Sequence, residues 1–198
     1  MFTTRLRFLT AGESHGPSLT GILDGLPAGL RLDEATIARD LARRQQGFGA
    51  GGRMKIEHDL ARITGGVMAG LTTGGPIALV VDNADHANWA NRDIAPMTVP
   101  RPGHADLTGA LKYGHQDLRL SLERASARET AMRVAIGSCC RALLAEFGIT
   151  IGGYVTRIGD VATAEGEIPV APDVYEERFT AAMANDVRCH EPAVAARM

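Results

Sequence analysis

The sequence predicts an α+β fold with a sizeable core. Segments 5–10 and 19–24 alternate loosely between apolar and polar residues, as β-strands do. Segments 33–47 and 121–147 instead carry apolar residues at the spacing of an amphipathic helix. The chain has 198 residues, of which 45% are hydrophobic and 22% are charged, so it has room for one large globular domain or two small ones.

The two helical segments are bounded and patterned by specific residues. Asp33 is the predicted N-cap of the first helix, and Gly47 with the glycines after it ends that helix. In the second helix Arg124 and Arg128 are four residues apart, and we expect them to share one face. The predicted apolar stripe of this helix consists of Met132, Ile136, Cys139, Leu143 and Phe147.

Turn residues and local periodicity predict the other elements. Residues 83–104 show little periodicity, and a loop of this length in a compact domain is more often functional than idle. Pro192 opens a helical pattern that no later residue terminates, so we expect the sequence to be a fragment of a longer chain; a frayed tail is the alternative. We predict a further helix over 173–184, and strands over 54–57, 61–65, 76–82 and 149–156.

Charge and cysteine usage argue against several classes of protein. The formal net charge is -2, which gives no global field for binding nucleic acid or an anionic membrane. Basic side chains outnumber acidic ones over 39–62 and acidic ones predominate over 160–191, so an anionic ligand would be drawn to the first region. The three cysteines match neither a metal site nor an even disulfide framework, and the first residues lack the apolar run of a signal peptide. We therefore expect a cytoplasmic protein with no metal.

The loop 12–16, with the sequence GESHG, is the first candidate site. It satisfies the pattern of a nucleophile elbow, which would make Ser14 the nucleophile of a serine hydrolase, but an elbow requires a helix directly after the serine. A strand-like run follows instead, so a strand-turn-strand arrangement is favoured. The Ser14 hydroxyl, the His15 imidazole and the backbone amides would then offer hydrogen bonds to an anion. A turn without function is the alternative.

The glycine-rich segment 47–52 (GFGAGG) has the letters of a dinucleotide-binding fingerprint in the wrong context. That fingerprint lies between a strand and the helix after it, whereas here a helix precedes the segment and a strand follows. What remains is a loop flanked by Arg44 and Arg53, whose planar guanidinium groups suit bidentate contacts with phosphate or carboxylate. Solvated surface arginines are the alternative.

The segment 100–104 (PRPGH) places Arg101 between two prolines and close to His104. Because each proline restricts the backbone, the placement of these two side chains favours a site. Histidine titrates near neutral pH, so His15 and His104 are candidate general acids. We interpret the other histidines as structural.

The segment 122–137 (LERASARETAMRVAIG) places Arg124, Ser126 and Arg128 at the entrance of the long predicted helix. Free backbone amides and the positive end of the helix dipole could meet a phosphate or a flavin head group there. A capped helix start with arginines in solvent is the alternative.

Five segments, taken together and in this order, resemble the N-terminal half of chorismate synthase over nearly the whole chain. They are AGESHGPSLTGILDGLPAGL, RRQQGFGAGGRMKIE, TTGGPIALVV, RPGHADLTGALKYGHQDLR and LERASARETAMRVAIG. The resemblance implies a helical layer between antiparallel sheets, with residues 1–198 as the N-terminal portion of one domain whose C-terminal half is absent. It also implies the last step of the shikimate pathway, which is the 1,4-anti elimination of phosphate from 5-enolpyruvylshikimate 3-phosphate to give chorismate.

The same resemblance implies a cofactor, an assembly and roles for single residues. The cofactor would be reduced FMN, although no net oxidation occurs, and the assembly a homotetramer. His15 would lie by the departing phosphate as a proton donor, and His104 would protonate the reduced flavin. Substrate contacts are implied for Ser14, Arg44, Arg53, Arg101 and Arg128, and cofactor contacts for Arg124, Ala125, Ser126 and Arg44. The residues agree with this, because a substrate with a phosphate and two carboxylates needs several arginines and an acid for its leaving group.

Two departures from the family pattern bear on activity. Ala50 stands where the family usually has an arginine, so one anion contact is absent. Family members are about twice as long, and their C-terminal half supplies further flavin contacts with a catalytic arginine and aspartate. We therefore expect residues 1–198 alone to bind FMN poorly and to turn over little or no substrate. A catalytically silent flavin- or anion-binding fragment is the alternative function. The sequence leaves open whether NADPH reduces the flavin within the protein or the reductant comes from outside.

Overall fold

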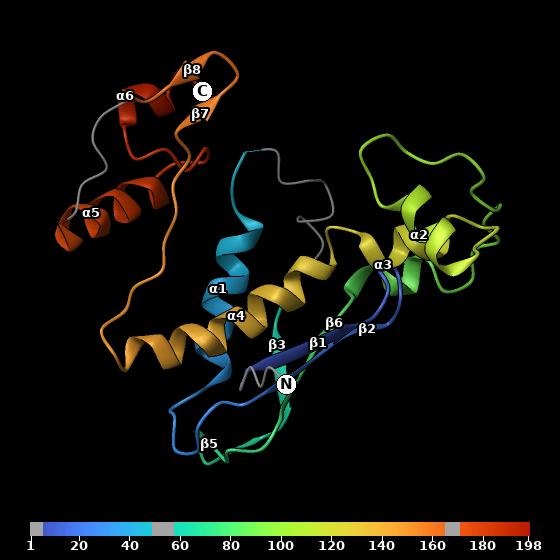
Figure 1. Ribbon diagram of the computed structural model, residues 1–198, viewed down its shortest axis with the longest axis horizontal. Coiled ribbons are helices and arrows are strands. Elements are labelled where there is room, and N and C mark those ends of the chain that lie inside the picture. The colour runs from blue at the N-terminus through green and yellow to red at the C-terminus, as the bar shows by residue number, and fades with distance from the viewer. Residues whose placement is uncertain (1–5, 49–57, 165–170) are drawn as a thin grey trace.

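The computed structural model describes residues 6–48, 58–164 and 171–198. Its centre is a four-stranded antiparallel sheet in the order β1-β2-β6-β3, formed by β1 (Arg7–Ala11), β2 (Ser18–Asp24), β6 (Ile77–Asp82) and β3 (Ala61–Gly65). Two helices, α1 (Glu34–Gln45) and α4 (Glu129–Ala145), lie side by side against this sheet (Figure 1). The chain is therefore an α+β protein with antiparallel sheets, as the sequence predicts.

The hydrophobic core lies between the sheet and these two helices. Alternate residues of β2 and β6 point toward the helices, so that Leu19 pairs with Val81 and Leu23 with Ile77 on the buried face. Burial of each such aliphatic side chain contributes about 1.5 to 3 kcal/mol. The helices supply the other side of the core through Ile37, Leu41, Ala131, Met132, Ala135, Ile136 and Cys139.

Gly21 allows α4 to approach the sheet closely. A Cβ atom at this position would lie 2.5 Å from the Met132 sulfur and 3.0 Å from Cδ1 of Ile136, and both of those residues are buried. Protein interiors are close-packed, so a side chain at position 21 would force α4 or its side chains to move. The missing side chain thus sets the distance between α4 and β2.

Smaller elements surround this core. The turn between β1 and β2 reaches α3 (Arg119–Ala125), and α2 (Asp106–Tyr113) lies beside α3 (Figure 1). The elements after residue 156 form a separate group at the end of the chain away from the sheet (Figure 1). The remaining elements are β4 (Val67–Met68), β5 (Leu71–Thr72), η2 (Ala84–Asn88), α2 (Asp106–Tyr113), α3 (Arg119–Ala125), β7 (Arg157–Ile158), β8 (Val161–Ala162), α5 (Pro172–Met183) and α6 (Pro192–Ala195).

Most of the elements predicted from the sequence are confirmed. The strands β1, β2, β3 and β6 lie within one or two residues of their predicted bounds, and so does helix α5. Asp33 is the N-cap of α1, where its side chain accepts a hydrogen bond from the Thr36 amide at 2.7 Å. The predicted strand over 54–57 lies outside the described residues.

The prediction of one continuous helix over 121–147 is wrong. The chain forms α3, breaks, and begins again as α4, because Ser126 has an extended backbone with φ -62° and ψ 153°. The Ser126 hydroxyl accepts the Arg128 amide at 3.3 Å, which is the local bonding by which serine competes with a helix. Arg124 and Arg128 therefore do not share a helix face, and Phe147 is exposed rather than part of the apolar stripe.

Two further differences concern residues 149–156 and α2. The predicted strand over 149–156 is wrong: the segment is irregular, and the Val155 amide donates to the Arg188 carbonyl at 2.8 Å. Its β-branched residues favour a strand, but no strand of the described residues lies beside it to pair with. Helix α2 was not predicted, since it follows directly on segment 83–104, whose sequence shows little periodicity. None of the helices in the described ranges is both long and apolar enough to cross a lipid bilayer.

Candidate functional site

The loop 12–16 is bound to α3 through Glu123. The Ser14 amide donates to the Glu123 carbonyl at 3.0 Å, and the His15 amide donates to Glu123 Oε2 at 2.9 Å. His15 Nδ1 lies 2.7 Å from Glu123 Oε1. One glutamate thus contacts two consecutive loop residues, and it contacts His15 through both its ring and its backbone.

The segment after β6, which includes η2, also packs against His15. The centroids of the Trp89 and His15 rings are 3.9 Å apart, and the Arg92 guanidinium group lies over the Trp89 ring, 4.9 Å from its centroid. His86 Nδ1 donates to the His15 carbonyl at 2.8 Å. The long loop that the sequence marks as functional therefore contacts a predicted site residue. The His15 side chain keeps 22% of its surface exposed.

Ser14 and Ser126 lie in contact although they are far apart in the sequence. The Ser126 hydroxyl donates to the Ser14 hydroxyl at 3.0 Å, and Ser14 is buried. The residues around Ser14 connect strand β1 to strand β2, which confirms the expected strand-turn-strand arrangement. The nucleophile elbow needs a helix at this point, so the structure contradicts its geometry.

Arg128 is the buried cation of the site. Its guanidinium group donates to Asp59 Oδ1 at 2.5 Å, to Asn83 Oδ1 at 2.7 Å and to the Asp82 carbonyl at 3.2 Å. The side chains of Arg128 and Asp59 are 2% and 1% exposed. Asn83 also donates to the carbonyl of Gly16 at 2.7 Å, so the buried ion pair is joined to the loop 12–16.

Arg44 reaches the same region from the last turn of α1. Its Nε donates to the Thr130 hydroxyl at 3.0 Å and a terminal nitrogen donates to the Ala127 carbonyl at 2.9 Å. Its other terminal nitrogen lies 3.5 Å from Asp59 Oδ2. Arg44 and Arg128 therefore converge on one carboxylate beside the break between α3 and α4. Arg53 and Ala50, on which two further expectations depend, lie outside the described residues.

Arg101 and His104 form a second group at the start of α2. Arg101 binds Asp106 in a bidentate ion pair, with contacts of 2.8 and 2.9 Å, and Asp106 is fully buried. Hydrogen bonds from the Arg101 side chain lower the pKa of Asp106 to about 2. His104 is exposed, and its Nδ1 donates to the Pro102 carbonyl at 3.0 Å. Within the described ranges, no hydrogen bond or ion pair joins this group to His15.

A pocket of about 470 Å³ lies between α2 and α3, beside the predicted cofactor residues. Arg124 and Ala125 line it from α3, and Lys112 and Tyr113 line it from α2. Arg124 also donates to the Thr10 hydroxyl at 2.7 Å, which connects this side of α3 to strand β1. The pocket therefore combines two cations with an aromatic ring.

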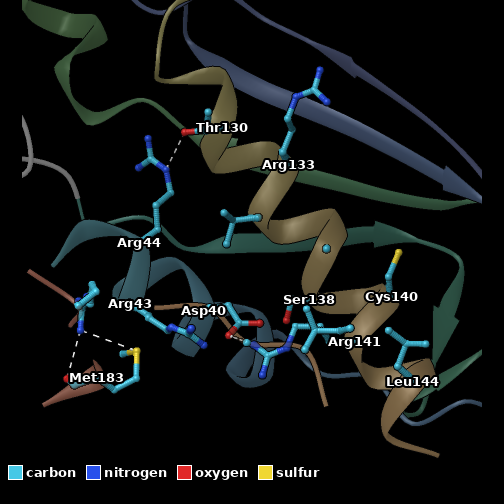
Figure 2. A pocket seen from close by; sticks show the side chains of 16 residues that line it. Asp40, Arg43, Arg44, Thr130, Arg133, Ser138, Cys140, Arg141, Leu144 and Met183 are labelled. Carbon is cyan, nitrogen blue, oxygen red and sulfur yellow. Dashed lines mark hydrogen bonds and ion pairs between the residues drawn. The ribbon is translucent and has the colours of Figure 1, made fainter. Parts of the chain in front are cut away.

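A larger pocket of about 750 Å³ lies along α1 and α4 (Figure 2). Arg44 is its one predicted site residue, and Figure 2 shows the Arg44 side chain directed to Thr130. Arg141 pairs there with Asp40 at 2.5 Å. His15, Ser14 and Arg128 do not line this pocket, so its size alone does not mark the predicted site.

Sequence reasoning missed the partners that hold the predicted residues. Glu123, Asp59 and Asn83 contact His15, Arg128 and the loop 12–16 from sequence positions far away. Glu123 stands directly before Arg124 in a segment already singled out, but nothing in its spacing indicates a contact with His15. For Asp106 the sequence offers only a weak signal, its position two residues after the PRPGH segment.

Comparisons with known proteins agree with these features. The family model for chorismate synthase matches residues 6–198. The chorismate synthase of Symbiobacterium thermophilum is 52% identical over 98% of this chain, which covers 52% of that protein. The chorismate synthase of Aquifex aeolicus is 55% identical over 81% of this chain, which covers 42% of that protein.

A solved structure, described as a crystal structure of chorismate synthase, has the same fold. It superposes with a TM-score of 0.78 at 41% identity, over 97% of this chain and 50% of that chain. The chain spans about half the length of the curated relatives it matches. With a family model that matches nearly every residue, the chain belongs to the chorismate synthase family.

Proposed function

We propose that this chain carries the part of a chorismate synthase active site that surrounds the departing phosphate group of the substrate. The reaction would be the 1,4-anti elimination of phosphate from 5-enolpyruvylshikimate 3-phosphate to give chorismate, the last step of the shikimate pathway that leads to the aromatic amino acids. The observation that carries the proposal is the gathering of Ser14, His15 and Ser126 at the break between α3 and α4, with Arg44 and Arg128 beside it.

The residues around His15 suit a proton donor to a departing phosphate. A histidine in this role contributes about 10²- to 10⁴-fold to the rate of a reaction. The His15 ring is partly exposed, and cationic side chains at the same helix break would attract an anionic substrate. Arg44, Arg53 and Arg101 are proposed to contact the anionic groups of the substrate. Direct contact of Arg128 with the substrate stays a prediction, because its guanidinium group is buried against Asp59.

The pocket between α2 and α3 fits a phosphorylated flavin in charge and chemistry. Arg124 and Lys112 suit the phosphate of FMN, and Ala125 and Tyr113 offer apolar and aromatic surface to a ring. We propose that Arg124, Ala125 and Ser126 hold reduced FMN and that the exposed His104 exchanges a proton with it. Reduced FMN is required for the family reaction although no net oxidation occurs, and NADPH is one source of the reducing equivalents.

The rest of the proposal concerns the longer protein of the family. The helical layer would lie between two antiparallel sheets, of which the sheet β1-β2-β6-β3 is one, and the assembly would be a homotetramer. Residues 1–198 alone would bind FMN poorly and form little or no chorismate, because half the length of the relatives is not represented in them.

A chimera tests the proposal. Residues 1–198 are joined to the remaining half of the Symbiobacterium thermophilum relative, and chorismate formation is measured anaerobically with dithionite-reduced FMN. We expect the chimera to form chorismate, and its His15→Ala and His104→Ala variants to lose about 10²-fold or more with the fold retained.

Two results would contradict parts of this proposal. Full activity of the His15→Ala chimera would remove His15 from the chemistry. A folded but inactive chimera would favour the alternative, in which the chain is a silent flavin- or anion-binding member of the family. Chorismate formation by residues 1–198 alone would refute the expectation that they need the rest of the protein.

A further inference from the structure

We infer that Glu123 is a positioning residue, which holds the His15 ring so that Nε2 is the nitrogen that exchanges a proton with a bound phosphate group. The inference deepens the proposed function and rests on it, since His15 is the proton donor there. The sequence motifs and the family resemblance both leave Glu123 without a role.

The hydrogen bonds at Glu123 determine which ring nitrogen is available. An ionised carboxylate has two acceptor oxygens and no proton to donate. His15 Nδ1, at 2.7 Å from Oε1, must therefore carry the hydrogen of that bond. Nε2 is then the nitrogen that gains or loses a proton when His15 acts as an acid or a base.

The second carboxylate oxygen makes the arrangement rigid. Oε2 accepts the His15 amide at 2.9 Å, so the same glutamate holds the ring and the backbone of one residue. A half-turn of the ring about its Cβ–Cγ bond would place a carbon where Nδ1 now lies and would break the bond to Oε1. Both oxygens are thus committed to His15, and the effect of Glu123 on a substrate would pass through His15.

Neighbouring groups restrict the ring from the other directions. Trp89 covers one face of the imidazole at 3.9 Å between centroids, and His86 Nδ1 donates to the His15 carbonyl at 2.8 Å. The Arg92 guanidinium group lies over the Trp89 ring, 4.9 Å from its centroid. The remaining exposed part of the His15 side chain is 22% of its surface.

The tautomer of His15 is the direct test, and it needs no activity. The chain is labelled with ¹⁵N, and the ring nitrogens are assigned by long-range proton-nitrogen correlation at a pH of about 8, where histidine is ordinarily neutral. We expect the hydrogen of His15 on Nδ1, whereas a free neutral imidazole mainly carries it on Nε2. His104 serves as an internal reference for the Nδ1–H form, because its Nδ1 donates to the Pro102 carbonyl.

Three substitutions separate the hydrogen bond from other effects. Glu123→Ala should move the His15 tautomer toward Nε2–H, whereas Glu123→Gln should keep Nδ1–H because its amide oxygen still accepts a hydrogen bond. Glu13→Gln is the matched control, since Glu13 is an exposed carboxylate of the same loop with no bond to His15. The His15 tautomer in the Glu13→Gln variant should match that of the unsubstituted chain. An Nε2–H tautomer at His15 in the unsubstituted chain would overturn the inference.

The chimera supplies the kinetic test. Glu123→Ala should lower kcat about 10- to 100-fold with little change in KM, and Glu123→Gln should recover part of the loss. In the His15→Ala background Glu123→Ala should have no further effect, because Glu123 acts through that ring. Additive losses in the double variant would overturn the inference and leave the proposed function standing. If the unsubstituted chimera formed no chorismate, the proposed function would fail, and the tautomer would still decide whether Glu123 holds the ring.

Discussion

Replacing Arg128 by methionine should destabilise the chain because it leaves a buried carboxylate without its shortest contact. Methionine keeps much of the length of the side chain but has no donor for Asp59 Oδ1, which lies 2.5 Å from the guanidinium group. The Asp59 side chain is 1% exposed, so water does not readily replace the lost partner. Asn83 Oδ1 loses its donor in the same substitution.

The size of the effect follows from what is left behind. Breaking a buried ion pair by removing one partner costs about 3 to 5 kcal/mol. Arg44 still lies 3.5 Å from Asp59 Oδ2, so we expect the lower end, about 3 kcal/mol. In a chain of this size each kcal/mol lowers Tm by about 2 to 4 °C, which gives a decrease of about 6 to 12 °C.

Urea unfolding followed by circular dichroism measures this change. Arg141→Met is the matched control, because Arg141 pairs with Asp40 at the surface and the loss of such a pair costs about 1 kcal/mol or less. Adding Asp59→Asn to Arg128→Met removes the stranded charge and should recover part of the loss. If the two methionine variants were equally stable, or if Asp59→Asn made Arg128→Met less stable still, the reasoning from burial would be refuted.

Two further predictions concern packing and pH. Gly21→Ala should destabilise the chain by about 1 to 3 kcal/mol in the same assay, because its Cβ would overlap Met132. Gly137→Ala has open space around its Cβ and should stabilise the chain by up to about 1 kcal/mol. Equal effects of the two substitutions would contradict the packing argument. The Asp106 pKa is lowered to about 2, below the unfolded value of about 3.9, so its ion pair stabilises the fold above that unfolded value and is lost as pH falls through about 2. Asp106→Asn should therefore be less stable than the unsubstituted chain at neutral pH, with a difference that shrinks from about pH 4 to pH 2; a difference independent of pH in unfolding experiments would contradict it.

Local signals in the sequence predicted the sheet and most helices well. The strands β1 and β2 follow from alternation over a few residues, and Asp33 caps α1 through a bond to Thr36, three residues away. Such patterns need no knowledge of the rest of the chain. The break at Ser126 was missed because helical residues lie on both sides of it, while the interruption itself depends on one hydroxyl and its neighbours.

The candidate site was predicted residue by residue but not as an arrangement. The motifs indicated Ser14, His15 and Ser126 separately, and only the fold brings the two serine hydroxyls to 3.0 Å. The motifs do not indicate burial either, since nothing in the sequence shows that Arg128 forms a buried ion pair with Asp59. Contacts that join distant segments depend on tertiary packing, and one sequence without pairing information does not specify them.

The bond between His15 and Glu123 has a consequence for the order of folding. The two residues are 108 positions apart, and Ser14 and Ser126 are 112 apart. A hairpin of β1 and β2 can form early from local contacts, whereas closing loops of this length is costly and slow. The site should therefore be among the last features to form during folding and among the first to disappear when α3 detaches. Hydrogen exchange at the His15 amide would then report on the docking of α3 rather than on the stability of the sheet beneath it.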